Sequence, residues 1–198
     1  MAASAVRLPP VLHWPECGKN PSIEGQLLLA TVNPKNSPNR EIARMAVREA
    51  LAELLPALLG LPSITLRSTP GQRPHIAERP DIGLSISHEP GLSVFAVHLD
   101  GPVGVDLLDL SSVPDDRDEL LRLSSEFLGP DMAQALADVP LTECRSQFAH
   151  AWASHEARLK CQGHALAEWQ QLPPSIRTTC GIATQMLASG HLVALALP

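Results

Sequence analysis

Residues 82–108 read IGLSISHEPGLSVFAVHLDGPVGVDLL, and this stretch decides the fold. Its apolar side chains gather in three short runs of the length typical of β-strands, at 82–87, 92–99 and 103–108. A turn is expected at 88–91, which contains Pro and Gly, and Gly101-Pro102 precedes the third run. The stretch therefore predicts a small meander of paired strands.

Helices are predicted on both sides of this meander. Before it, Ser37-Pro38-Asn39-Arg40 opens a helix, apolar residues recur at helical spacing over 42–55, and Gly60 ends the pattern. After it, helical regions are expected at 114–123, 131–137 and 143–161. Further strands are expected at 27–32, 64–67, 176–182 and 191–197, and a loop at 69–80.

The order of these elements predicts an α+β fold built from two similar halves. In each half a helix comes first and short strands follow, so the halves are taken as residues 1–100 and 101–198. The join is expected near 99–103, where Gly and Pro interrupt the apolar pattern.

Composition excludes several classes of protein. The chain has 198 residues, of which 44% are hydrophobic and 18% charged, as in an ordinary globular protein. Its formal net charge of −6 argues against a nucleic-acid binder and means that an anionic ligand needs a local basic cluster. No apolar stretch approaches the ~20 residues that span a membrane. With no apolar leader and four widely spaced cysteines, the protein is expected in the cytoplasm with reduced thiols.

The first candidate site lies at the end of the third strand. Asp106 and Asp109 place carboxylates there, and carboxylate oxygens are the ligands that Mg²⁺ takes in proteins. A strand that simply ends in a polar turn explains the same residues.

Two further segments carry polar residues suited to chemistry. Glu156 and Lys160 are four residues apart and therefore share one helix face. They are either a surface ion pair, or Glu156 binds a metal or a proton while Lys160 binds a phosphate. Ser87 and His88 end the first strand of the meander, where a histidine is either structural or a hydrogen-bond donor to an anion.

The order and spacing of these segments resemble the 4′-phosphopantetheinyl transferases, in particular the larger, pseudo-dimeric type that activates surfactin synthetase. The resemblance covers the chain from about Asn39 to the C-terminus. It rests on these segments: Arg73-Pro74, Leu84-Ser85-Ile86-Ser87-His88, Gly104-Val105-Asp106, Trp152 to Lys160, and secondarily Phe127-Leu128-Gly129-Pro130-Asp131 and the arginines at 40–48. It implies a pseudo-dimeric fold within one chain, with the active site between the halves, and a monomer.

The resemblance also implies a role for each matching residue. Asp106 and Glu156 would bind Mg²⁺, and Glu156 is also the candidate general base. Lys160 and His88, with Ser87 before it, would bind coenzyme A phosphates. Arg73 would lie near the adenosine end of coenzyme A, and Arg44 matches, more loosely, a basic residue of the early helix. The implied reaction transfers the phosphopantetheine arm of coenzyme A to a serine of an acyl or peptidyl carrier protein and releases 3′,5′-ADP.

Three positions depart from the pattern of this family. Leu108 stands where a second acid is usual, so Asp109 or water would have to complete the metal shell. His155 replaces a lysine next to Glu156. Its ordinary pKa of about 6.5 leaves a histidine largely neutral at pH 7, nearby phosphates would raise that pKa, and activity is expected to fall as His155 deprotonates. Gln72 replaces a glycine before Arg73. The alternative is therefore a degenerate homologue that binds coenzyme A or a carrier protein without transfer.

Two other classes of protein compete with this interpretation. His150, His155 and Glu156 suggest a zinc hydrolase, but two ligating histidines on a helix should be four apart with the glutamate after the first. A structural or interaction module is the non-enzyme alternative. It would leave Asp106 and Glu156 far apart in space.

Overall fold

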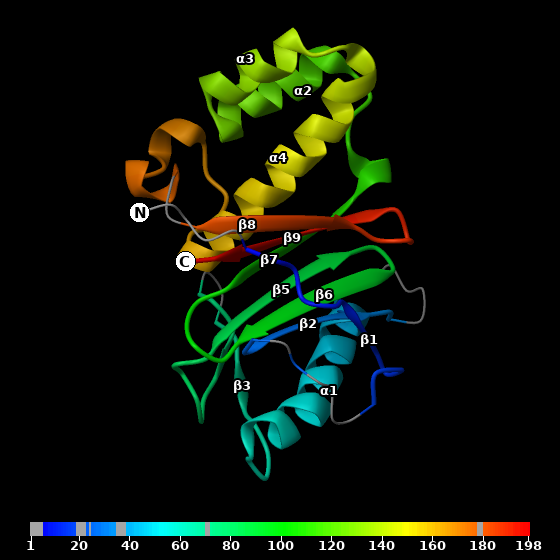
Figure 1. Cartoon of the computed structure of the whole chain (residues 1–198), viewed down its shortest axis with the longest axis vertical. Helices are drawn as coiled ribbons and strands as arrows, with labels where there is room; N and C mark the ends of the chain where they lie inside the picture. The colour runs from blue at the N-terminus through cyan, green and yellow to red at the C-terminus, as the bar shows by residue number, and fades with distance from the viewer. Residues whose placement is uncertain (1–5, 19–22, 24, 35–38, 70–71, 178–179) are drawn as a thin grey trace.

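Two β-sheets form the centre of the molecule in the computed structural model, which describes residues 6–18, 23, 25–34, 39–69, 72–177 and 180–198 (Figure 1). The strands of the first sheet lie in the order β1 (Leu12–Trp14), β2 (Leu27–Val32), β6 (Leu92–His98) and β5 (Gly83–Glu89). Those of the second lie in the order β7 (Gly104–Asp109), β9 (His191–Leu197) and β8 (Gly181–Met186). All neighbouring strands are antiparallel except β1 and β2. β3 (Leu66–Arg67) and β4 (His75–Ile76) form a separate pair.

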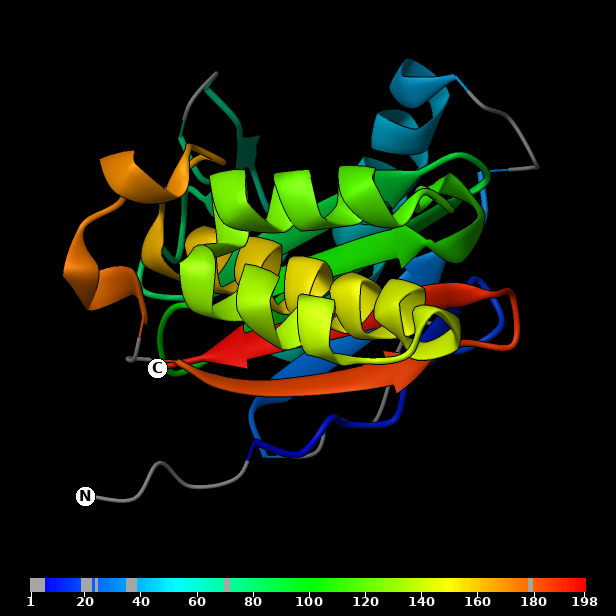
Figure 2. The ribbon, with the colours of Figure 1, turned by 90° about the horizontal axis from the view of Figure 1, so that it is seen from above.

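Helices cover the outer face of each sheet. α1 (Arg40–Leu59) lies against the first sheet, and α4 (Leu141–Gln162) against the second, with α2 (Arg117–Leu123) and α3 (Pro130–Asp138) stacked beyond it (Figures 1 and 2). A π-helical turn (Ser124–Leu128) joins α2 to α3, and 3₁₀ turns occur at Leu110–Ser112, Trp169–Gln171 and Pro174–Arg177. The side chain of Asn39 caps α1 by accepting a hydrogen bond from Glu41 N at 2.8 Å.

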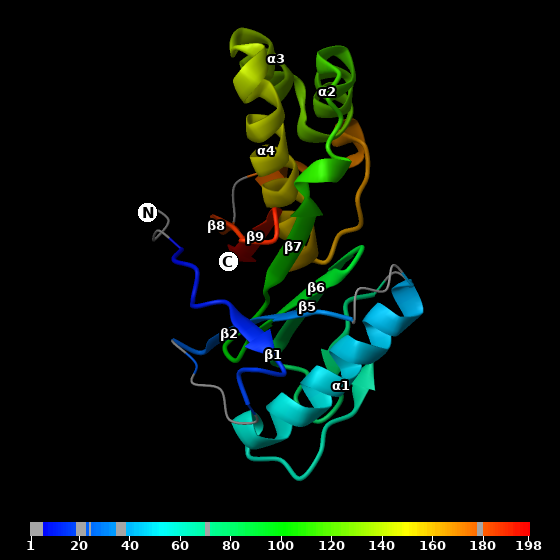
Figure 3. The same cartoon turned by 90° about the vertical axis from the view of Figure 1, so that its right-hand side faces the viewer.

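The sequence produces four layers because strands inside the two sheets, such as β2 and β9, are apolar on both faces. Leu27 and Leu29 of β2 point to the second sheet and pack with Val105 and Leu107 of β7. The alternate residues of β2, which are Leu28, Ala30 and Val32, pack under α1. Every residue of β2 is buried for this reason, and the order of layers is α1, first sheet, second sheet, α4 (Figure 3).

The two halves of the chain repeat one topology. In the first half, β2 is followed by α1, β5 and β6, and β6 lies between β2 and β5. In the second half, β7 is followed by the helices, β8 and β9, and β9 lies between β7 and β8. The expected boundary at residues 100 and 101 falls in the connection between β6 and β7.

The α+β class is confirmed, and most of the expected elements are present. The expected strand at 176–182 is wrong over its first part, because Ile176 belongs to a 3₁₀ turn and packs with Leu159 and Leu172, whereas β8 starts at Gly181. The expected turn at 88–91 is shorter, because β5 continues to Glu89. Ser37, Pro38, Pro70, Gly71 and residues 178–179 lie outside the described residues. Over the described part of the chain, no helix has the length and apolarity to cross a membrane.

Candidate active site between the sheets

The strand β5 sends its side chains alternately to two sides, and this alternation places the first site residues. Leu84 and Ile86 pack under α1, and His88 follows them on that side of the strand. Ser85 and Ser87 lie on the opposite side, toward β7. Ser85 Oγ accepts a hydrogen bond from Val105 N at 2.9 Å, which holds the two sheets together beside the site.

Asp106 lies on the face of β7 that is covered by α4. Its neighbours Val105 and Leu107 face the first sheet, whereas Leu108 packs among the residues under α4. Asp106 is buried, with 6% of its surface exposed, so its carboxylate needs polar partners.

Asp106 finds these partners in two distant parts of the chain. Lys160 Nζ of α4 lies 2.6 Å from Asp106 Oδ1, and Ser87 Oγ of β5 donates a hydrogen bond to the same oxygen at 2.9 Å. Lys160 also donates to Ser87 Oγ at 3.0 Å. Three segments that were singled out from the sequence thus meet at one buried carboxylate.

Gly104 permits this meeting because α4 passes directly over it. A Cβ at position 104 would lie 1.9 Å from the carbonyl oxygen of Ala157 and 2.4 Å from Cys161 N. Only a residue without a side chain allows the helix to lie so close to β7. The contact falls one turn or less from Lys160, so it sets the distance between Lys160 and Asp106.

Glu156 lies one helical turn before Lys160 on α4. Burial raises the pKa of its carboxyl group above the ordinary value, the nearby charge of Asp106 raises it further, and Lys160 opposes the shift. The charge of Asp106 therefore reaches Glu156. Trp152 fixes this part of α4, because its ring packs 5.6 Å from that of Phe127 and 5.5 Å from that of Phe148.

A further acid at the site was missed from the sequence. Glu89 ends β5 on the same side as Ser87, and its carboxyl group accepts a hydrogen bond from the backbone of Asp109. Burial raises the pKa of Glu89, as do the charges of Asp106 and Asp109. The sequence does show an acid directly after His88. Because a turn was expected at 88–91, the direction of the Glu89 side chain could not be predicted.

Basic side chains face the same region from α1. Burial lowers the pKa of His88 to about 4, and the positive charges of Arg40, Arg44 and Lys160 lower it further. His88 is therefore neutral at pH 7, and its Nδ1 lies 2.8 Å from Ser93 Oγ. Arg44 and Lys160, which the sequence associated with the same anionic ligand as His88, both lower the pKa of His88.

Arg73 lies on the other flank of Lys160, next to a small cavity. Its Nη2 donates to the carbonyl oxygen of Cys161 at 2.5 Å, and its guanidinium packs over Gly163 at the end of α4. A cavity of about 220 Å³ opens between the loop that carries Arg73 and the end of α4. The residues that line it include Gln72, Arg73, Ser85, Lys160 and His164.

The expected role of His155 is corrected by its surroundings. His155 is buried, and burial lowers its pKa to about 4, with a further contribution from Arg158. The imidazole is therefore neutral at pH 7, and it cannot replace the fixed positive charge of a lysine there. Its helical position aligns it with Leu159, not with Glu156 and Lys160.

Asp109 does not join Asp106 as a metal ligand in this arrangement. β7 continues through Asp109, so its side chain projects to the side opposite Asp106. The carboxylate instead accepts hydrogen bonds from Ser111 N at 2.8 Å and Ser111 Oγ at 2.7 Å. These bonds and burial act oppositely on the pKa of Asp109, which is lowered overall.

The donor set at this site suits Mg²⁺ only in part. Among the described residues, no three histidine, cysteine or acidic side chains are grouped so that they could hold a metal ion. The described residues therefore also contain no group of ligands of the kind that the zinc hypothesis needs. His150 Nδ1 lies instead 3.2 Å from Thr184 Oγ1. Asp106 and Glu156 supply two carboxylates, and Mg²⁺ commonly takes one or two and completes its shell with water and substrate phosphates.

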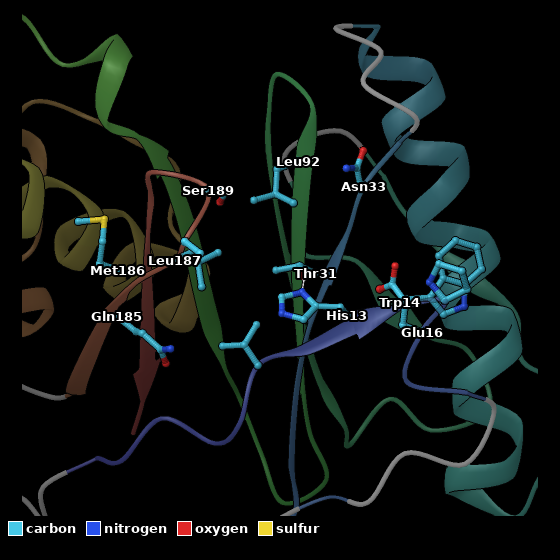
Figure 4. A pocket seen from close by; sticks show the side chains of 13 residues that line it. His13, Trp14, Glu16, Thr31, Asn33, Leu92, Gln185, Met186, Leu187 and Ser189 are labelled. Carbon is cyan, nitrogen blue, oxygen red and sulfur yellow. Dashed lines mark hydrogen bonds between the residues drawn. The ribbon is translucent and has the colours of Figure 1, made fainter.

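The largest cavity that we describe lies away from these residues. It has a volume of about 740 Å³ and opens between β1 and the turn that joins β8 to β9 (Figure 4). His13 lies at its wall with Nδ1 2.6 Å from Thr31 Oγ1, and Leu92, Met186 and Leu187 give it an apolar part. None of the site residues expected from the sequence lines this cavity.

Comparison with known proteins does not assign a family. No protein-family model matches the chain, and no curated protein matches its sequence.

Proposed function

We propose that this chain is a 4′-phosphopantetheinyl transferase that moves the phosphopantetheine arm of coenzyme A to a serine of an acyl or peptidyl carrier protein. One observation carries the proposal: Lys160, Asp106 and Ser87 come from three separate motifs of that family's pattern and meet within 3.0 Å of one another. Glu156 lies in the same environment. A structural or interaction module was expected to leave Asp106 and Glu156 far apart, whereas the charge of Asp106 reaches Glu156.

The repeated topology supports the finer fold assignment. A pseudo-dimeric transferase needs two similar halves with a site between them, and here β2-α1-β5-β6 and β7-helices-β8-β9 have the same strand order. Ser85 and Ser87 of the first half bond to Val105 and Asp106 of the second. One chain then contains the complete site, so we propose a monomer.

The charges around the site suit the phosphates of coenzyme A. Arg40 and Arg44 approach from α1, and Lys160 approaches from α4. Arg73 and Lys160 both line the cavity of about 220 Å³, which we assign to the adenosine end. A chain with a net charge of −6 holds an anion only through such a local cluster.

The acids provide the remaining chemistry. Glu156, with its raised pKa, is suited to accept the proton of the carrier serine as the serine oxygen attacks the β-phosphate and 3′,5′-ADP leaves. Lys160 stabilises negative charge that develops on the phosphoryl oxygens. Asp106 and Glu156 would hold Mg²⁺, which when bound neutralises charge on the pyrophosphate.

Intact-mass analysis of an apo carrier protein tests the proposal. Incubation with this chain, coenzyme A and Mg²⁺ is expected to add the mass of one phosphopantetheine arm. Glu156→Gln should lower the rate by about 10²-fold or more, because it removes the proton acceptor. Glu143→Gln is the matched control, since Glu143 is an exposed acid at the start of the same helix.

The second candidate is a degenerate homologue that binds coenzyme A or a carrier protein without transfer. Leu108, packed under α4 where the family has an acid, is the observation that favours it. Calorimetry separates the two candidates. Coenzyme A binding without any mass gain on several carriers would support the degenerate homologue, and neither binding nor transfer would refute both.

A further inference from the structure

Two of the four cysteines lie together at the end of α4. Cys161 is in the last turn of the helix and has 2% of its surface exposed, whereas Cys180 directly precedes β8 and is half-buried. Cys180 packs against the apolar cluster that contains Cys161. Gln162, the residue directly after Cys161, donates a hydrogen bond from its Nε2 to Cys180 Sγ at 3.5 Å.

We propose that Cys161 and Cys180 are a modification site: a thiol pair that a hydroperoxide converts to a reversible disulfide between the end of α4 and the start of β8. The two thiols are neighbours in the fold, because Cys180 packs against the apolar cluster that contains Cys161 and the residue next to Cys161 contacts the Cys180 sulfur. The inference does not depend on the proposed transferase activity.

The surroundings assign the order of the two chemical steps. Burial raises the pKa of the Cys161 thiol to about 12, with a further contribution from Cys180, so Cys161 stays protonated. Cys180 is the more accessible sulfur, so it is the one that meets the oxidant.

In the first step, the Cys180 thiolate attacks one oxygen of hydrogen peroxide. The O–O bond breaks, Cys180 becomes a sulfenic acid, and the other oxygen leaves as water after taking up a proton. In the second step, the Cys161 sulfur attacks the sulfenic sulfur, the S–S bond forms and a second water leaves with the Cys161 proton. Two thiols and one peroxide thus give one disulfide and two waters.

The other two cysteines are not placed to compete. Cys144 lies near the start of α4, about 25 Å from Cys161 along the helix at 1.5 Å per residue. Cys17 lies in the apolar cluster under α1, on the far side of both sheets. In a reducing compartment, a single contacting pair of this kind is reduced at rest and oxidised transiently.

The bond would form beside the candidate active site. Cys161 follows Lys160 directly, and its carbonyl oxygen is the acceptor for Arg73. A disulfide at this point ties the end of α4 to the second sheet, and with it the segment that carries Lys160.

Hydrogen peroxide and mass spectrometry test the inference on the full chain. After treatment, the intact mass should fall by two hydrogen atoms, and dithiothreitol should restore it. A digest under non-reducing conditions should yield one cross-linked peptide, which joins Cys161 to Cys180. Cys180→Ser should abolish both signals, and Cys17→Ser, a half-buried cysteine elsewhere, should leave them unchanged.

Two results would overturn the inference. One is a wild-type mass that rises by oxygen atoms or does not change, because a contacting partner thiol should trap the sulfenic acid. The other is a cross-link that joins any other pair of cysteines. Circular dichroism of Cys180→Ser establishes that the variant is folded, and the wild-type digest does not depend on any variant.

Discussion

Ser87 Oγ donates a hydrogen bond to Asp106 Oδ1 at 2.9 Å, and this bond links the edge of the first sheet to the first strand of the second. The same oxygen accepts from Lys160 at 2.6 Å, so one buried carboxylate organises residues from β5, β7 and α4. The side chains of Lys160 and Asp106 are 28% and 8% exposed, so water weakens their interaction only in part.

The pairing of Lys160 with Asp106 predicts a coupling that a double-mutant cycle can measure. Lys160→Met alone leaves a buried carboxylate with one partner fewer, which should cost about 1–3 kcal/mol in the free energy of unfolding. Adding Asp106→Asn should cost less in the Lys160→Met background than in the wild type. Urea unfolding of the four proteins measures the coupling, and additive effects would show that the pair is energetically independent.

The close passage of α4 over Gly104 predicts a steric penalty for any side chain there. Gly104→Ala should lower the free energy of unfolding by about 3 kcal/mol, because the helix has to move away from β7. Gly190→Ala is the control, since a Cβ at Gly190 meets open space and only its φ of 81° is unfavourable. Equal destabilisation of the two variants would contradict the steric explanation.

The buried histidine His155 predicts a loss of stability in mild acid. Its pKa is about 4 in the folded state and about 6.5 in the unfolded state, so between these values the unfolded chain binds the extra proton. This contribution is complete above pH 6.5 and is lost as the pH falls toward 4. His155→Gln should therefore flatten the dependence of unfolding free energy on pH over this interval.

Denaturant unfolding at several pH values measures that slope. His164→Gln is the control, because His164 is exposed and should leave the slope unchanged. A slope for His155→Gln that is parallel to the wild type would mean that His155 does not titrate abnormally. Because His155 is already neutral at pH 7, its titration should also leave the rate of the proposed transfer near neutral pH unaffected.

The approach of α1 to the site predicts unequal roles for its arginines. The charges of Arg40 and Arg44 lower the pKa of His88, whereas Arg48 lies a further turn along the helix. If coenzyme A binds as proposed, Arg44→Ala should raise its KM about tenfold with little change in kcat, because a charge-assisted phosphate contact is lost. Steady-state kinetics should show that Arg48→Ala changes KM much less. An equal rise in both variants would indicate a diffuse effect of charge.

The sequence predicted the long helices and the central strands well, because their apolar periodicity is strong. α1 and α4 begin and end within a few residues of expectation, and Gly60 caps α1 in the left-handed conformation as its position indicated. The third strand also ends at the expected acids. Its apolar residues could not reveal which of them face α4, since both faces of the sheet are buried.

The errors concern residues whose environment is set by distant contacts. The low pKa of His155 follows from burial that nothing in its local spacing indicated. Ile176 was assigned to a strand, yet it packs with Leu159 and Leu172 instead. Glu89 was overlooked because its direction depends on β5 continuing past His88. The small size of Gly104 matters only once α4 lies on it.

The repeated strand order has a consequence for how such a chain can evolve. In a symmetric dimer of two identical chains, every substitution occurs in both copies. A substitution that improves one of the two equivalent sites therefore also changes the other. Here the two copies of the topology are covalently joined and free to diverge. The helix of the first half, α1, carries arginines, and the helix at the same place in the second half, α4, carries a glutamate and a lysine. Two joined halves that differ in this way can form one asymmetric centre, whereas a dimer of identical copies has two equal ones.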